Sequence, residues 1–177
     1  AEVQEIDDLI ASILSYARLD HPEVRMHWQE VPLENWLKLI IGKSGVDGID
    51  VSLDVTNGPR KAWMDPRLME LALSNLLVNA CRYSKHEVRC VAAQSNDEDW
   101  LAVEDDGRGI PQAEREKVFK AFTRIDDSRN RETGGYGLGL AIVARIAQLH
   151  GGEASVETSP ELGGAKFQIR WSYTGKS

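Results

Sequence analysis

The sequence predicts an α+β fold. We expect a two-layer sandwich in which a mixed, largely antiparallel sheet of about five main strands is covered on one face by about three helices. Short segments such as 49–55 and 165–171 alternate apolar and polar residues between turn residues, which is typical of strands with one buried face. Other segments repeat apolar residues every three or four positions, which is typical of helices packed on a sheet.

Size and charge exclude several classes of protein. The chain has 177 residues, of which 42% are hydrophobic, so one domain with a real core is expected. A net charge of −7 argues against a nucleic-acid binder, which usually carries a basic face. No apolar run is long enough to cross a bilayer and no signal-peptide pattern opens the chain, so we expect no membrane contact from these residues. Cys81 and Cys90 lack metal-ligand spacing and are interpreted as ordinary thiols in a reducing compartment.

Residues 1–20 predict a helix. Its apolar residues step by three and four positions in a heptad-like seam, which Leu9 and Leu14 widen. The seam consists of Val3, Ile6, Ile10, Ile13 and Ala17. This pattern leaves two interpretations open: a helix that packs on its own domain, or the end of a longer coiled or bundled element.

The next part of the chain predicts strands at 24–28, 49–55 and 61–64 and a helix that starts at Pro32. Asp65 followed by Pro66 predicts a helix start, with an N-cap acceptor and a proline at the first helical position. The apolar side of that helix is expected to contain Met69, Ala72, Leu73, Leu76, Leu77 and Ala80.

The second half of the chain predicts four strands and two helices. Paired strands are expected at 88–94 and 100–104, and final strands at 153–158 and 165–171. The two helices are expected at 112–121 and 138–150, separated by a polar loop at 123–135. Gly151 and Gly152 are expected to end the second of them.

Three clusters carry chemistry. The helix after Asp65 places Asn75, Asn79 and Tyr83 on one stripe beside Arg82, and an asparagine oxygen suits a Mg²⁺ ion that already carries phosphate. Two solvated or capping asparagines are the simpler interpretation of this stripe taken alone.

The second cluster is Asp105, at the end of a strand. A buried aspartate there can accept the amino group of adenine and repels the carbonyl of guanine. An ordinary Asp-Gly turn remains the alternative.

The third cluster is the glycine-rich stretch "TGGYGLGLAIV" (133–143), which directly precedes a helix. Free N–H groups at a helix N-terminus bind anions. The loop before it contributes Arg124, Arg129 and Arg131, which predicts a cationic lid over bound phosphates.

These clusters in this order resemble the ATP-binding catalytic domain of bacterial two-component sensor histidine kinases, in the gyrase–Hsp90–histidine kinase–MutL superfamily. "NLLVNACRY" resembles the N box, "EDDGRGI" the G1 box, "VFKAFTR" the F box, "GGYGLGLAIV" the G2 box and "GGAKF" the last glycine box. The resemblance covers about residues 32–171 and implies a Bergerat-type sandwich. Residues 1–20 are similar to the end of the second helix of the family's dimerisation and phosphoacceptor domain, which makes 21–31 a linker with a first strand and 32–177 the catalytic domain.

The resemblance also implies roles for individual residues. Asn79 would hold Mg²⁺, while Asn75, Arg82 and the lid residue Arg124 would act on the phosphates. On the base side, Asp105 would recognise adenine. The remaining nucleotide contacts would come from Tyr83, Gly107, Gly109, Ile110, Phe119, Phe122, Gly135, Gly137, Leu138, Gly139, Leu140, Gly163 and Gly164.

The phosphoacceptor histidine of the family, in a motif resembling H-E-[LFI]-R-T-P, is missing. His21 stands directly before Pro22, which obstructs a helix through it, and His27, His86 and His150 lack the motif. We therefore expect a fragment that binds ATP and Mg²⁺ but needs the missing half of its dimerisation domain to be phosphorylated. The resemblance further implies a homodimer, a response regulator as partner, and a cytoplasmic domain of a protein held in the bacterial inner membrane.

Superfamily members that hydrolyse ATP carry a glutamate one turn before the metal-binding asparagine, whereas this chain has Asn75. We therefore expect slow hydrolysis and a preference for transfer to histidine. Two alternatives remain: a stand-alone serine kinase of the anti-sigma type, which the N-terminal helix disfavours, and an interaction module without nucleotide, which the complete set of motifs disfavours.

Overall fold

The computed structural model of the chain describes residues 2–44, 48–95, 97–123 and 136–172. A five-stranded sheet has the order β2-β4-β5-β7-β6. Only the β2–β4 pair is parallel, so the sheet is mixed and largely antiparallel, as predicted. Its strands are β2 (Asp50–Asp54), β4 (Glu87–Ser95), β5 (Glu98–Asp105), β6 (Glu153–Thr158) and β7 (Ala165–Trp171).

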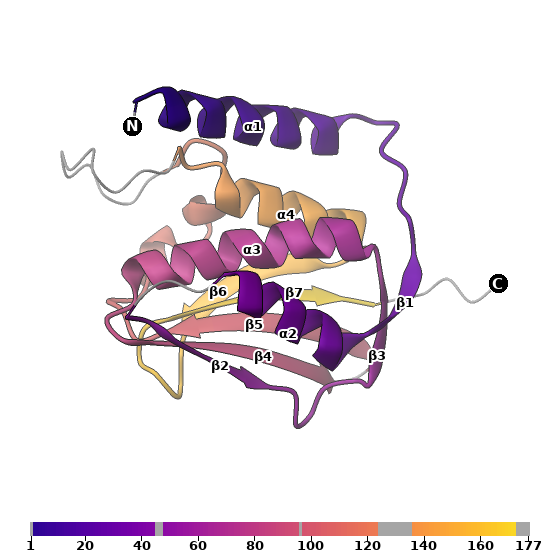
Figure 1. The fold of residues 1–177 in the computed structure, drawn as a ribbon, viewed down its shortest axis with the longest axis vertical. Coiled ribbons are helices and arrows are strands. Elements are labelled where there is room, and N and C mark those ends of the chain that lie inside the picture. The colour runs from indigo at the N-terminus through magenta and orange to yellow at the C-terminus, as the bar shows by residue number, and fades with distance from the viewer. Residues whose placement is uncertain (1, 45–47, 96, 124–135, 173–177) are drawn as a thin grey trace.

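Three helices lie on one face of this sheet (Figure 1). They are α2 (Leu33–Lys43), α3 (Pro66–Tyr83) and α4 (Gly139–Leu149). The apolar side expected of α3 is confirmed, since all six of its members are buried. The helix α4 ends as expected, because Gly151 has a φ of +73° and its N–H bonds to the carbonyl of Gln148.

A separate two-stranded ribbon pairs β1 (Gln29–Pro32) with β3 (Lys61–Met64). The strand expected at 24–28 is therefore wrong in position. The pairing register starts with Gln29 opposite Met64, where β3 ends, so residues before Gln29 have no strand to pair with. Instead, the N–H of His27 bonds to the Asp65 carboxylate.

The helix expected at 112–121 is also wrong. The structure has two short 3₁₀ helices there, η1 (Gln112–Glu114) and η2 (Lys117–Phe119). Val118 is the buried residue of this charged segment, and Phe119 is partly buried, so too little apolar surface faces the core to hold a full helix. The predicted loop after it lies mostly outside the described residues.

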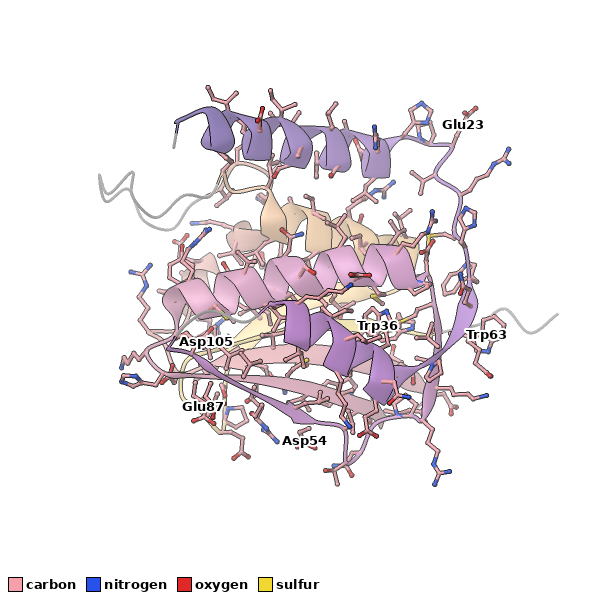
Figure 2. The ribbon with its side chains drawn as sticks, in the orientation of Figure 1. Glu23, Trp36, Asp54, Trp63, Glu87 and Asp105 are labelled. Atoms are coloured by element: carbon pink, nitrogen blue, oxygen red, sulfur yellow. The ribbon has the colours of Figure 1, made fainter. Side chains whose placement is uncertain are left out.

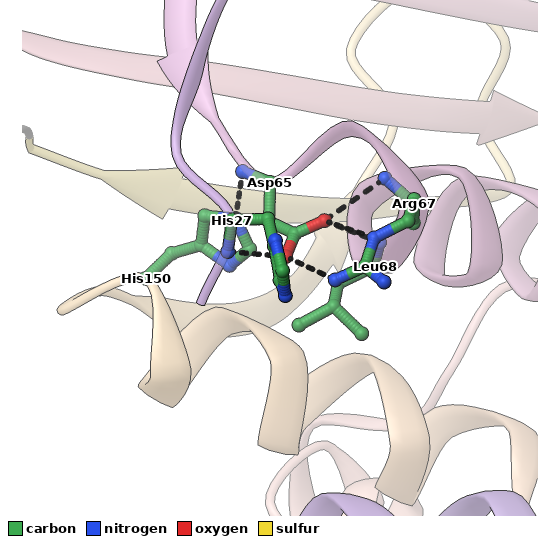
Figure 3. A network of polar contacts seen from close by, with 5 residues as sticks. All are labelled: His27, Asp65, Arg67, Leu68 and His150. Atoms are coloured by element: carbon green, nitrogen blue, oxygen red, sulfur yellow. Dashed lines mark hydrogen bonds and ion pairs between the residues drawn. The ribbon is translucent and has the colours of Figure 1, made fainter. Parts of the chain in front are cut away.

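A carboxylate ties three segments together at the start of α3 (Figure 3). Asp65 is fully buried and caps α3 by accepting from the N–H groups of Arg67, at 3.1 Å, and Leu68, at 3.4 Å. It also accepts from the N–H of His27 at 2.8 Å, and its own N–H donates to Nε2 of His150 at 3.0 Å. Burial raises the pKa of Asp65, but the hydrogen bonds from Arg67, His27 and Leu68 outweigh it and leave the pKa below its ordinary value.

The first helix, α1 (Glu2–Asp20), lies along α4 (Figure 1). The described part of the predicted seam points to solvent, with Ile6, Ile10 and Ile13 between 41% and 56% exposed. A different stripe faces the domain, in which Tyr16 is partly buried and Leu19 is buried. The helix thus packs on its own domain and still presents an apolar seam. Among the described helices, none combines the length and apolar character that crossing a bilayer requires.

Candidate functional site

Residues of all five motifs gather at one end of the sandwich. The C-terminal end of α3, the end of β5, the turn between β6 and β7 and the start of α4 meet there, on the left in Figure 1. Figure 2 labels Asp105 at this end, close to the last turn of α3. The site has two parts, which we call the base end, around Asp105, and the phosphate end, at the N-terminus of α4.

Asp105 is the centre of the base end. It is 2% exposed, and its Oδ1 accepts from the N–H groups of Gly107, at 2.8 Å, and Ala165, at 3.2 Å. Neither bond uses Oδ2. Burial raises the pKa of Asp105, the two N–H groups oppose this, and the neighbouring Asp106 raises it further. A buried carboxylate oriented in this way can accept a hydrogen bond from a neutral N–H donor.

Two glycines let the backbone close around this carboxylate. A Cβ at Gly164 would collide with the carbonyl oxygen and Oδ1 of Asp105, and one at Gly107 would collide with the carbonyl of Tyr83. The G1 box, the last glycine box and the end of the N box therefore meet on bare backbone. Glycine at these two positions therefore allows the three segments to pack closely around the carboxylate.

The sequence did not single out two residues of the base end. Ala165 supplies an N–H to Asp105, and Ser159 organises the turn that carries Gly163 and Gly164. The Ser159 hydroxyl donates to buried Glu104 at 2.7 Å and accepts from the N–H of Leu162 at 2.9 Å. The Ser-Pro pair that opens "SPELGG" was the available signal, because serine side chains often bond to the backbone of their own turn.

Asn75 joins α3 to the start of α4. Its side-chain N–H donates to the carbonyl of Leu71 at 2.8 Å, and a Cβ at Gly139 would lie 2.8 Å from its Oδ1. The N box and the G2 box thus meet at this asparagine, and glycine at position 139 allows the approach without a shift of the Asn75 side chain. In this structure the Asn75 side chain packs between α3 and the start of α4.

The phosphate end is the N-terminus of α4. No side chain in the described part of the chain caps it, and Leu138, which precedes Gly139, is buried. The first N–H groups of a helix have no partner within the helix and, with the positive end of the helix dipole, can bind an anion. The carbonyl of Gly137 accepts from the N–H of Phe122 at 2.9 Å, which ties the F box to the G2 box.

The apolar residues expected at the site differ in burial. Phe119 packs edge-to-face on Phe167, with ring centroids 6.2 Å apart, while Ile110 and Leu140 are partly buried against the core. Phe122 is 65% exposed and has a φ of +63°. Its side chain therefore does not hold the segment in place, and its backbone bond to Gly137 does.

The polar residues of α3 lie along the route between the two ends. Asn79, one turn after Asn75, is half-buried, and Arg82, two turns after Asn75, is exposed. Tyr83 is 44% exposed, and the guanidinium of Arg108 lies 5.8 Å from its ring centroid. The predicted lid residues Arg124, Arg129 and Arg131 and the expected ligand Gly135 lie outside the described residues.

The chain is similar to known proteins over most of its length. Residues 64–175 match the family described as "Histidine kinase-, DNA gyrase B-, and HSP90-like ATPase". The sensor protein RstB of Escherichia coli is 41% identical over 96% of this chain and 40% of its own length, and the sensor histidine kinase CpxA of the same species is 32% identical over 95% and 37%. The chain thus spans about two fifths of these relatives.

Two solved structures are similar in fold and in sequence. The ATP-binding domain of PrrB from Mycobacterium tuberculosis matches with a TM-score of 0.65 and 31% identity, over 83% of this chain and 96% of that one. Full-length ShkA in complex with AMPPNP matches with a TM-score of 0.76 and 25% identity, over 93% of this chain and 35% of that one.

Proposed function

We propose how this chain works from the premise that it belongs to the family of histidine kinase-, DNA gyrase B- and HSP90-like ATPases. It is an ATP-binding catalytic domain of the sensor histidine kinase type. The proposal is that it holds Mg-ATP across the base and phosphate ends, for transfer of the γ-phosphoryl group to a histidine on a dimerisation domain and relay to a response regulator.

The observation that carries the proposal is the arrangement around Asp105. Two backbone N–H groups hold Oδ1, and Oδ2 remains for the exocyclic amino group of adenine. Guanine presents a carbonyl oxygen at that position, which a carboxylate repels. Glycine at positions 107 and 164 lets the backbone pack tightly around this carboxylate and hold it in this orientation.

The phosphate end fits a triphosphate with its metal. The uncapped N-terminus of α4 offers N–H groups to phosphate oxygens, and Arg82 adds a mobile positive charge. Asn79 would give Mg²⁺ one neutral oxygen ligand, with the nucleotide and water supplying the others. The bound nucleotide supplies the phosphoryl group, and the residues of the chain position it and neutralise developing charge.

Asn75 supports transfer over hydrolysis. Its side chain bonds to Leu71 and abuts Gly139, and an amide is a poor base for activating water. We therefore expect Asn75→Glu to raise phosphate release from ATP and Asn75→Gln, of matched size, to leave it low, as followed by a phosphate-release assay. Equal rates in the two variants would contradict this account.

The apolar seam of α1 supports a dimerisation role for the longer protein. Ile6, Ile10 and Ile13 form a stripe in contact with water, which a helical bundle would bury. We propose that this seam joins the remainder of a homodimeric phosphoacceptor domain, in a protein anchored in the inner membrane with this part in the cytoplasm.

Calorimetric titration tests the proposal. We expect a non-hydrolysable ATP analogue to bind, more tightly with Mg²⁺ than without it, and the matching GTP analogue to bind at least tenfold more weakly. A chain that melts cooperatively but binds neither analogue would overturn the proposed function.

A further inference from the structure

The last turn of α1 is docked on the catalytic domain. Leu19 is 5% exposed within the main core, and Tyr16, one turn earlier, packs against the same core. The seam residues Ile10 and Ile13 of the same helix remain exposed. One helix therefore presents one stripe to the catalytic domain and another to solvent.

Arg145 of α4 holds this turn in place. Its Nε donates to the carbonyl oxygen of Leu19 at 2.9 Å and lies 3.8 Å from Oδ1 of Asp20. The last carbonyls of a helix have no partner within the helix, and a cation there is favourable to the helix dipole. Nη1 also reaches Gln148, one turn on, at 3.4 Å, which orients the guanidinium on α4.

The same helix reaches the proposed phosphate site. Arg145 stands six residues after Gly139, which is about 9 Å along a helix at 1.5 Å per residue. The two helices lie alongside one another (Figure 1). The packing of α1 on α4 therefore determines the orientation of the α4 N-terminus relative to α1.

Past α1, the next hydrogen bond between the linker and the catalytic domain, among the described residues, runs from the N–H of His27 to Asp65. Residues 21–26 between the two attachments are mostly exposed and contain no helix or strand. Without the Arg145 contact, α1 would be held only by the apolar contacts of Tyr16 and Leu19 among the described residues, and by this short segment.

We infer that Arg145 is a positioning residue. It acts as a latch that holds the dimerisation helix α1 against α4 and thereby fixes the orientation of the nucleotide site relative to α1. The inference rests on the proposed function for its consequence in catalysis. The latch itself can be tested without nucleotide, so the two can fail separately.

The first test measures the distance between α1 and the domain by double electron–electron resonance. Spin labels are attached to Asp7→Cys on α1 and Asn35→Cys on α2, both exposed positions, in a chain with Cys81→Ser. We expect a narrow distance distribution in the otherwise unchanged chain, a broad one in Arg145→Ala, and a narrow one again in Arg145→Lys, because lysine can still donate to the Leu19 carbonyl. Arg18→Ala, at an exposed arginine of α1, is the matched control and is expected to stay narrow.

The second test separates positioning from binding. Affinity for the ATP analogue is expected to stay within twofold in Arg145→Ala. In the longer protein that carries the phosphoacceptor helix, the same change is expected to lower kcat for histidine phosphorylation about tenfold or more with KM for ATP unchanged. An unchanged distance distribution in Arg145→Ala would overturn the latch, and an unchanged kcat would overturn its positioning role. Failure of the unaltered chain to bind the analogue would instead count against the proposed function.

Discussion

The base end and the phosphate end of the candidate site are built in different ways. At the base end, Asp105 is 2% exposed and two backbone N–H groups hold its carboxylate. Glycines allow the main chain to pack directly against it. At the phosphate end the polar groups are exposed or half-buried side chains of α3 and the open N-terminus of α4.

The difference teaches which part of recognition is preorganised. Backbone and buried groups around Asp105 lose little freedom when a ligand binds, so they can select the base. Arg82 is a long, exposed side chain, so we expect its contact with a ligand to be weaker and more sensitive to salt. Selectivity is therefore expected to come from the base end and metal dependence from the phosphate end.

The largest effect is expected from Asp105→Ala, which removes the base end's acceptor. Loss of a hydrogen bond to a charged group should lower affinity for the ATP analogue by roughly 100-fold, as measured by calorimetry. Affinity for the GTP analogue is expected to be low in the unaltered chain and should fall little further in this variant. Affinity for the ATP analogue within threefold of the unaltered chain would remove Asp105 from recognition.

Gly164→Ala tests whether the base end is rigid. The added Cβ collides with the Asp105 carbonyl and carboxylate, so we expect the free energy of unfolding to fall by about 1–3 kcal/mol in urea titrations. Gly163→Ala is the neighbouring control, since nothing lies within 4 Å of its Cβ and only its φ of +81° is unfavourable. A larger loss in Gly163→Ala would mean that backbone strain, and not close packing, dominates this turn.

At the phosphate end, Asn79→Ala should act only through the metal. We expect affinity for the ATP analogue to fall about tenfold with Mg²⁺ present and to change little in its absence. Asn79→Asp, which keeps an oxygen ligand, is the matched variant and should retain the dependence on Mg²⁺. An equal loss with and without metal would contradict the assignment.

The smallest effect is expected outside both ends, at His150. Its Nε2 accepts from the N–H of Asp65, so the neutral ring carries its proton on Nδ1, next to the carbonyl of Ile146. Burial lowers the pKa of His150, while Ile146 and Asp65 oppose this.

The sign follows from that direction. The unfolded chain takes up the proton at a higher pH than the folded one, so stability is present above about pH 6.5 and falls as the pH drops from there towards the lowered pKa. We expect the free energy of unfolding to fall between about pH 6.5 and pH 5 in urea titrations, and to fall less in His150→Gln. Identical pH profiles would show that another group is responsible.

Much of this structure could be predicted from the sequence because its signals are local. Asp65-Pro66 starts α3, and the strand at 165–171 alternates without interruption, so caps and periodicity were enough. The strand at 24–28 failed because the end of its partner β3, and not its own residues, decides where β1 begins. The helix at 112–121 failed because its charged residues have helix propensity, whereas the core receives mainly Val118 and Phe119.

Sequence patterns single out candidate site residues by their type, but they do not reveal contacts that the backbone makes. Asp105 and the glycines stand out by composition, but the N–H of Ala165 and the seating of Asn75 against Gly139 depend on contacts between residues 60 and 64 positions apart. No local pattern contains such a contact.

The network around Asp65 has a consequence for how the linker is held. Asp65 binds a residue 38 positions before it and is bonded to one 85 positions after it, so the contacts close long loops. The linker is therefore attached at His27 through a residue that the start of α3 and the end of α4 also hold. Its attachment depends on the tertiary structure of the catalytic domain and not on the local sequence of the linker.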